Sequence, residues 1–207
     1  MNQDFQIERQ EEILYYWFGR LEVDSAPSDR HVKMWYSNGK QIDEDIKFRF
    51  ELDLKRALEG KLDTWLDVPR GSLAFIILID QFSRNVYRGT PKAFEGDSVA
   101  LKASLNGIEK GFDITLHPIE RLFYYMPLMH SEDLEIQMTS LECFTMLEKL
   151  FTTPPSIASI ISTSKMYAEK HYLMIEKFGR FPHRNGIIGR SSTPEELKFL
   201  KDSNFSF

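Results

Sequence analysis

The feature that most constrains this chain is a helical spacing of apolar residues, cut repeatedly by glycine and proline. The clearest segment begins after Pro154 and Pro155 and ends at Gly179. Within it, residues three or four apart form one face, as on one side of an α-helix. That face comprises Ile157, Ile160, Ile161, Ser164, Ala168, His171, Ile175 and Phe178.

The same spacing predicts helices elsewhere, bounded by glycine stops and proline starts. We expect them over residues 7–18, 43–58, 97–110, 118–125, 132–151 and 194–200. The apolar run 73–79 would also suit a buried strand, but Pro69 fits the first turn of a helix and favours that interpretation. No period-two strand pattern and no low-complexity linker occurs. The sequence therefore predicts an all-α fold in a single domain over residues 1–207.

Composition limits the classes of function. The chain has 207 residues, 42% of them apolar, and 16 Phe, and a chain of this length buries roughly 70% of its unfolded surface. The net charge of −5 is well mixed, without the basic face of a nucleic-acid binder. The single Cys143 permits no internal disulfide, and the amino terminus lacks the features of a signal peptide. We expect a cytoplasmic protein that binds neither nucleic acid nor membrane; the oligomeric state is left open.

Three short polar blocks lie directly beside strongly apolar segments. Charged groups there are costly to bury unless they meet partners. The blocks are DQFSRN (80–85), HSED (130–133) and GRFPHRN (179–185). We expect all three to converge on one shared polar site.

The first block predicts an anion site if the helix that starts at Pro69 continues through it. Asp80, Arg84 and Arg88 then lie four residues apart, with Asn85 beside them. One carboxylate with two guanidiniums leaves surplus positive charge, which suits a carboxylate or phosphate ligand. The alternative is an Asp80–Arg84 ion pair that only holds a helix end.

The second block predicts a histidine at the start of a helix. We expect Ser131 to be the N-cap, with Glu132 and Asp133 in the first turn. The helix dipole at that end opposes protonation, so His130 is expected to be a neutral imidazole that can accept a proton. The alternative is a histidine that only makes local hydrogen bonds.

The third block follows His171, which lies on the inward face of its helix. His171 is either a core histidine with one partner or a residue that shares a cavity with His130. After Gly179, a loop stiffened by Pro182 is expected to present four polar side chains, those of Arg180, His183, Arg184 and Asn185.

A metal site is disfavoured. His130, Glu132, His171 and His183 are of the right type, but their spacing matches no metal motif. The neighbouring arginines would also repel a cation. We therefore expect no metal and no cofactor.

Longer phrases around these blocks resemble a known family. DQFSRNVYRG (80–89), ERLFYYMPLMHSED (120–133) and KFGRFPHRNGIIGRSSTPEELKFL (177–200) are similar to the bacterial domain of unknown function 924 family, and ILYYWFG (13–19) also matches its pattern. The resemblance covers nearly the whole chain, although Ser83 stands where family members often have proline. It implies a TPR-like, right-handed arrangement of antiparallel helix pairs. It implies no activity, because the family is uncharacterised.

Three functions remain open from the sequence. In the first, which we favour, the chain is a binding module whose arginines hold an anionic small molecule or a peptide carboxylate. In the second it is a hydrolase or transferase, with His130 or His171 as general acid or base and Asp80 or Glu132 orienting the imidazole. In the third the polar blocks are a buried hydrogen-bond network with a structural role alone. Whether the protein is an enzyme therefore stays open.

Overall fold

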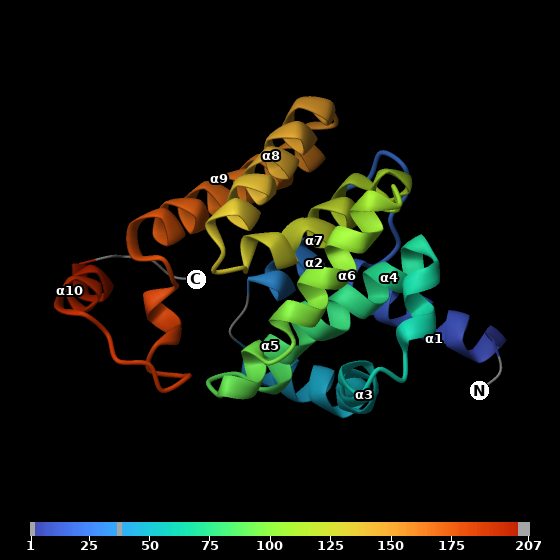
Figure 1. The fold of residues 1–207 in the computed structure, drawn as a ribbon. Helices are drawn as coiled ribbons and strands as arrows, with labels where there is room; N and C mark the ends of the chain where they lie inside the picture. Colours follow the sequence, from blue (N-terminus) through green and yellow to red (C-terminus); the bar gives the residue numbers. More distant parts are fainter. Residues whose placement is uncertain (1–2, 37–38, 203–207) are drawn as a thin grey trace.

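The computed structural model describes residues 3–36 and 39–202, and within these ranges it is helical with no strand (Figure 1). The first half contains α1 (Gln3–Phe18), α2 (Asp29–Trp35), α3 (Lys40–Leu58), α4 (Pro69–Ile76), α5 (Ser83–Val86) and α6 (Asp97–Glu109). The second half contains α7 (Pro118–Met129), α8 (Leu134–Leu150), α9 (Pro155–Phe178) and α10 (Pro194–Asp202). The all-α prediction is confirmed, and the TPR-like arrangement stays a prediction.

Short helical turns connect these elements. Four are 3₁₀ turns: η1 (Asp63–Asp67), η3 (Pro91–Phe94), η4 (Asp113–Thr115) and η5 (Pro182–Arg184). The fifth, η2 (Ile77–Phe82), is a π-helical turn that joins α4 directly to α5. No helix in the described part of the chain is long and apolar enough to cross a membrane.

The core surrounds α4 and η2. Residues 73–79 are all buried, in a helical conformation that begins with Pro69 at the first helical turn. Aromatic rings pack around this helical segment. The ring centre of Trp17 lies 5.5 Å from that of Phe82 and 5.8 Å from that of Phe123, both in edge-to-face contacts. One cluster of buried apolar side chains takes its members from elements between Ile13 and Ala168. The predicted choice of helix over strand is therefore correct.

The predicted end of α7 near Pro127 is wrong. The helix continues to Met129 with Pro127 inside its last turn. A proline removes one backbone donor, and the helix nevertheless closes because His130 N–H donates to the Met126 carbonyl at 3.0 Å. His130 is therefore the C-cap of α7.

The predicted cap of α8 is also displaced. Asp133, two residues beyond Ser131, is the N-cap, and its Oδ1 accepts from Glu135 N–H at 2.9 Å and Ile136 N–H at 3.1 Å. Together with the longer α7, this leaves a short connection over residues 130–133. The HSED block is that connection.

The two longest carboxy-terminal helices, α8 and α9, form an antiparallel pair (Figure 1). Lys165 on α9 pairs with Glu148 on α8 at 3.3 Å near one end, and Phe181 N–H reaches Glu132 at 2.8 Å beyond the other. Gly179 ends α9 with φ of 67°, as predicted. The following loop and α10 pack on a small apolar cluster of their own, formed by Met174, Ile175, Phe178, Phe181 and Phe199.

The close packing of α6 on α7 gives a stability prediction. Gly107 of α6 lies against the ring of Tyr124, so a methyl group there would collide with the phenol. We expect Gly107→Ala to lower the free energy of unfolding by about 1–3 kcal/mol in urea titrations, because a packed core tolerates extra volume poorly. The matched control is Gly186→Ala, which has open space around it. Equal stability of the two variants would contradict this account.

Candidate functional site

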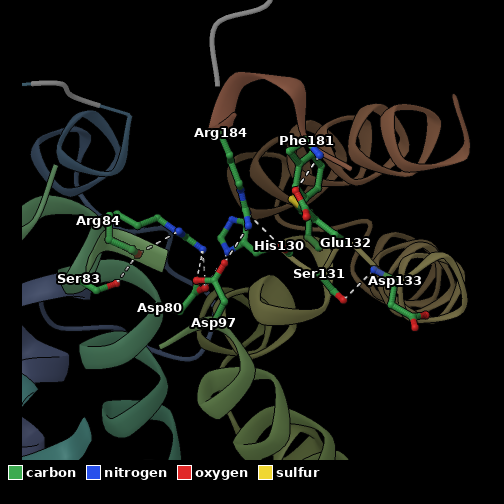
Figure 2. Close-up of polar contacts among 12 residues, drawn as sticks. Asp80, Ser83, Arg84, Asp97, His130, Ser131, Glu132, Asp133, Phe181 and Arg184 are labelled. Carbon is green, nitrogen blue, oxygen red and sulfur yellow. Dashed lines mark hydrogen bonds and ion pairs between the residues drawn. The ribbon is translucent and has the colours of Figure 1, made fainter. Parts of the chain in front are cut away.

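Five elements bring charged side chains together beside the carboxy-terminal part of the continuous helical segment α4–η2–α5 (Figure 2). Asp80 comes from η2 and Arg84 from α5, Asp97 is the first residue of α6, His130 caps α7, and Arg184 comes from η5. Each polar block of the sequence contributes at least one residue. We call these five residues the central cluster.

Asp80 is the deepest member of the central cluster, with no exposed surface. Its Oδ1 accepts from His130 Nδ1 at 2.7 Å and from Arg84 Nη2 at 3.2 Å, and its Oδ2 accepts from Gln81 Nε2 at 2.6 Å. Burial alone would raise the pKa of Asp80, but His130 and Arg84 lower that pKa overall. Asp80 is therefore an ionised carboxylate inside the fold.

Asp97 bridges the two arginines of the cluster. It accepts from Arg84 Nη2 at 3.0 Å and from Arg184 Nη1 at 2.9 Å. Arg184 also donates to the His130 carbonyl at 3.0 Å, and its guanidinium lies 4.7 Å from the Phe94 ring centre. Burial, followed by repulsion from Arg84, lowers the pKa of Arg184 to about 10.

Two carboxylates and two guanidiniums balance in the central cluster. The surplus positive charge expected from Asp80, Arg84 and Arg88 is therefore absent there, because Asp97 joins the cluster and Arg88 does not. An anionic ligand would have to compete with an internal carboxylate.

Two more histidines extend from the cluster. The ring of His171 lies 6.1 Å from that of His130, and the ring of Phe181 lies 5.3 Å from His171 and 5.6 Å from His183. Burial, followed by the charge of His130, lowers the pKa of His171 to about 3. Burial, followed by the charge of Arg184, lowers the pKa of His183 to about 4. Both rings are neutral at pH 7.

The helix-dipole argument for a neutral His130 does not hold. It placed His130 at the amino-terminal end of a helix, whereas His130 is the C-cap of α7. The negative end of the α7 dipole and the Asp80 carboxylate both face this imidazole. His171, by contrast, is buried and hydrogen-bonds through Nδ1 to the Tyr167 carbonyl at 2.8 Å, as expected of a core histidine.

Asn85 and Arg88 lie apart from the central cluster. Both bind Asp43 of α3: Asn85 Nδ2 at 2.8 Å, and Arg88 through Nε at 2.6 Å and Nη2 at 2.8 Å. They hold α5 against α3. Their assignment to the same anion site as Arg84 is therefore not supported by the geometry.

A second group of predicted residues fastens the loop after α9. Glu132 accepts from Arg190 at 2.6 and 2.8 Å, and Arg190 Nε donates to Asn185 Oδ1 at 2.9 Å. Arg180 pairs with Glu196 through Nε at 2.6 Å and Nη2 at 2.8 Å. These contacts of Glu132, Arg180 and Asn185 hold the loop in place. None of the contacts involves Asp80 or Asp97.

Four carboxylate or guanidinium partners were missed from the sequence: Asp43, Asp97, Arg190 and Glu196. One signal for Glu196 was available, since Thr193 and Glu196 have capping-box spacing. In the structure Glu196 Oε2 accepts from Thr193 N–H at 2.7 Å, and Thr193 Oγ1 accepts from Glu196 N–H at 3.2 Å. Asp97 carries no such signal beyond its place at the start of a helix. Across the described ranges, no group of three or more His, Cys, Asp or Glu side chains is placed to hold a metal ion.

Comparison with known proteins defines the family. A family model described as a bacterial protein of unknown function (DUF924) matches residues 13–204. The chain belongs to this family. Its fold is similar to that of a protein of unknown function, ATU0120, from Agrobacterium tumefaciens, with a TM-score of 0.80 and 29% sequence identity over 96% of this chain and 99% of that chain. The comparison with curated proteins found no match.

The depressed pKa of His171 predicts how stability responds to acid. Because the folded state holds this pKa near 3 against 6.5 in the unfolded chain, the unfolded state binds more protons as the pH falls below 6.5. His171 should therefore contribute a loss of about 2 kcal/mol in the free energy of unfolding between pH 7 and pH 5. His171→Phe should remove that part of the pH dependence in urea titrations at both pH values. An unchanged pH dependence in the variant would contradict the assignment.

Proposed function

We propose that His130 and Asp80 form a general acid–base pair that acts on a small molecule carrying an anionic group, in a hydrolysis or transfer reaction. The observation that carries this proposal is the 2.7 Å hydrogen bond between His130 Nδ1 and the fully buried, ionised Asp80. The His130 side chain keeps 16% of its surface exposed, whereas that of Asp80 has none. The pair therefore has a buried orienting end and an end that solvent reaches.

The chemistry follows from this geometry. In the neutral form of His130, Asp80 accepts a hydrogen bond from Nδ1–H, which fixes the tautomer and leaves the lone pair on Nε2. Nε2 can then take a proton from an attacking hydroxyl or water and return it to the leaving group. The Asp80 carboxylate stabilises the imidazolium formed between these two steps.

Arg84 and Arg184 supply the anion recognition in this proposal. Both guanidiniums lie beside the pair, since Arg84 shares Asp80 with His130 and Arg184 donates to the His130 carbonyl. Guanidiniums in such positions stabilise negative charge that develops during acyl or phosphoryl transfer. His171 is left out of the catalytic role that the sequence allowed, because its low pKa makes it a poor base near neutrality.

The proposal extends to the setting of the protein. We place it in the cytoplasm as one domain, with an anionic small molecule or a peptide carboxylate as its partner, and with no nucleic acid, membrane or cofactor. Burial raises the pKa of the lone Cys143 thiol to about 11, so this cysteine plays no part in the chemistry.

The catalytic proposal predicts different results for two residues of one polar block. In a screen of phosphate esters and carboxylate esters, His130→Gln should abolish the turnover of any substrate found for the native chain. Glu132→Gln should retain turnover but lower the free energy of unfolding, because Glu132 holds Arg190 and the Phe181 backbone. Full turnover by a folded His130→Gln protein would rule the proposal out.

Binding without catalysis is the second candidate, and one observation favours it. Asp97 accepts hydrogen bonds from both guanidiniums. It therefore fills the position that the carboxylate or phosphate of a ligand would take between them. The Asp97 side chain keeps 20% of its surface exposed, so a competing anion can approach the two guanidiniums from that side.

This candidate makes a prediction about Asp97. Removing its charge should unmask the arginines, so that Asp97→Asn unfolds at a lower temperature in plain buffer but gains more thermal stability from inorganic phosphate than the native chain does. Thermal unfolding with increasing phosphate at constant ionic strength measures this. A purely structural network predicts the loss without the phosphate-dependent gain.

A further inference from the structure

The outer face of α8 carries apolar side chains that no part of the described fold covers. The inward face is formed by Gln137, Ser140, Phe144 and Leu147, which are buried. On the other side, Leu134, Met138, Met146 and Leu150 are 42–58% exposed. Such a concentration of exposed Leu and Met on one helix marks an interaction surface.

These four residues form one ridge with a symmetric sequence. They lie four residues apart around Glu142, so that the row reads Leu, Met, Glu, Met, Leu from 134 to 150. Residues four apart make the ridges by which helices pack into each other's grooves. The middle of the ridge forms one wall of an open groove of about 520 Å³, whose other lining residues are Leu141, Thr145, Lys149 and Tyr172. The surface thus offers both a ridge and a groove to receive one.

The charges on the same face follow the same symmetry. Glu135 and Lys149 lie seven residues on either side of Glu142 and are both exposed. Neither forms an ion pair with another described residue, in contrast to the adjacent Glu148, which binds Lys165. When two copies of α8 cross antiparallel about Glu142, Glu135 of each copy faces Lys149 of the other.

We propose that this face of α8 pairs two copies of the chain around a two-fold axis that passes near Glu142. A two-fold interface must be complementary to itself, and the face meets that condition in both shape and charge. Met138 then packs near Met146 of the second copy, two Glu135–Lys149 pairs face each other on either side of the axis, and Leu134 and Leu150 flank the contact. The repeated Glu142 at the centre is the one unfavourable element, because it meets its own copy.

Charge exchange tests the pairing with the full-length chain. Sedimentation equilibrium should find a reversible dimer of the native chain. Glu135→Lys alone and Lys149→Glu alone should each weaken dimerisation by about tenfold, because each places like charges opposite one another twice. The double variant Glu135→Lys/Lys149→Glu should restore the native affinity. If the single variants had damaged the fold, a second charge reversal would not repair it. The rescue therefore distinguishes a broken interface from a damaged fold.

Two further variants complete the test. Met138→Glu should give a monomer, and Glu142→Gln should tighten the dimer, because it removes the like-charge contact at the axis. The control is Phe48→Glu, which changes a 91% exposed apolar residue on α3 and should leave the dimer intact. A native chain that stays monomeric up to the millimolar range, or a dimer that survives Met138→Glu, overturns the proposal.

Discussion

The buried carboxylate of Asp80 is the interaction on which the arrangement of the central cluster depends. An ionised group without solvent must be met by donors, and removing one partner of such a group typically costs about 3–5 kcal/mol. The donors come from the adjacent Gln81, from Arg84 one turn later, and from His130 at the end of α7. The π-helical turn places the carboxylate where these three directions meet, and such turns are frequent at functional sites.

A run of alternating charges begins at this carboxylate. Asp80 is followed by Arg84, Asp97 and Arg184, each within hydrogen-bond distance of the next. This alternation lets four charged side chains share a largely buried region without net charge. The arrangement differs from the other arginine contacts described above, where each guanidinium meets its own carboxylate. Here two guanidiniums share one carboxylate, and the pKa of Arg184 is lowered by its burial and then by repulsion from Arg84.

Helices and their glycine stops were predictable from the sequence because they depend on local physics. The stripe from Ile157 to Phe178 and the left-handed Gly179 need only the chain's own period and the freedom of glycine. The continuation of α7 through Pro127 was not predictable in this way. The cost of a proline depends on its place in the helix and on what closes the following turn, which the chain beyond Pro127 decides.

The partners of the arginines were harder to predict than the arginines themselves. Arg84 and Arg88 lie one helical turn apart, yet one binds Asp80 and Asp97 while the other binds Asp43. The Asp80 contact follows from the four-residue spacing, but no local pattern predicts Asp97 or Asp43, because both come from other helices placed by core packing. The π-helical turn was not predictable from the sequence either, because one extra residue in a helical turn does not alter the order of apolar side chains.

The central cluster depends on the carboxy-terminal segment through the loop that follows α9. Arg184 enters the cluster from this loop, and the loop is held by Glu132, two residues after the histidine that Asp80 orients. The connection 130–133 therefore carries both the acid–base candidate and the anchor of the loop. Glu132 itself reaches Arg190 and the Phe181 backbone rather than Asp80. These loop contacts hold the second and third polar blocks together. The hydrogen bond between Asp80 and His130, 50 residues apart in sequence, joins the first block to the second and is not one of those contacts.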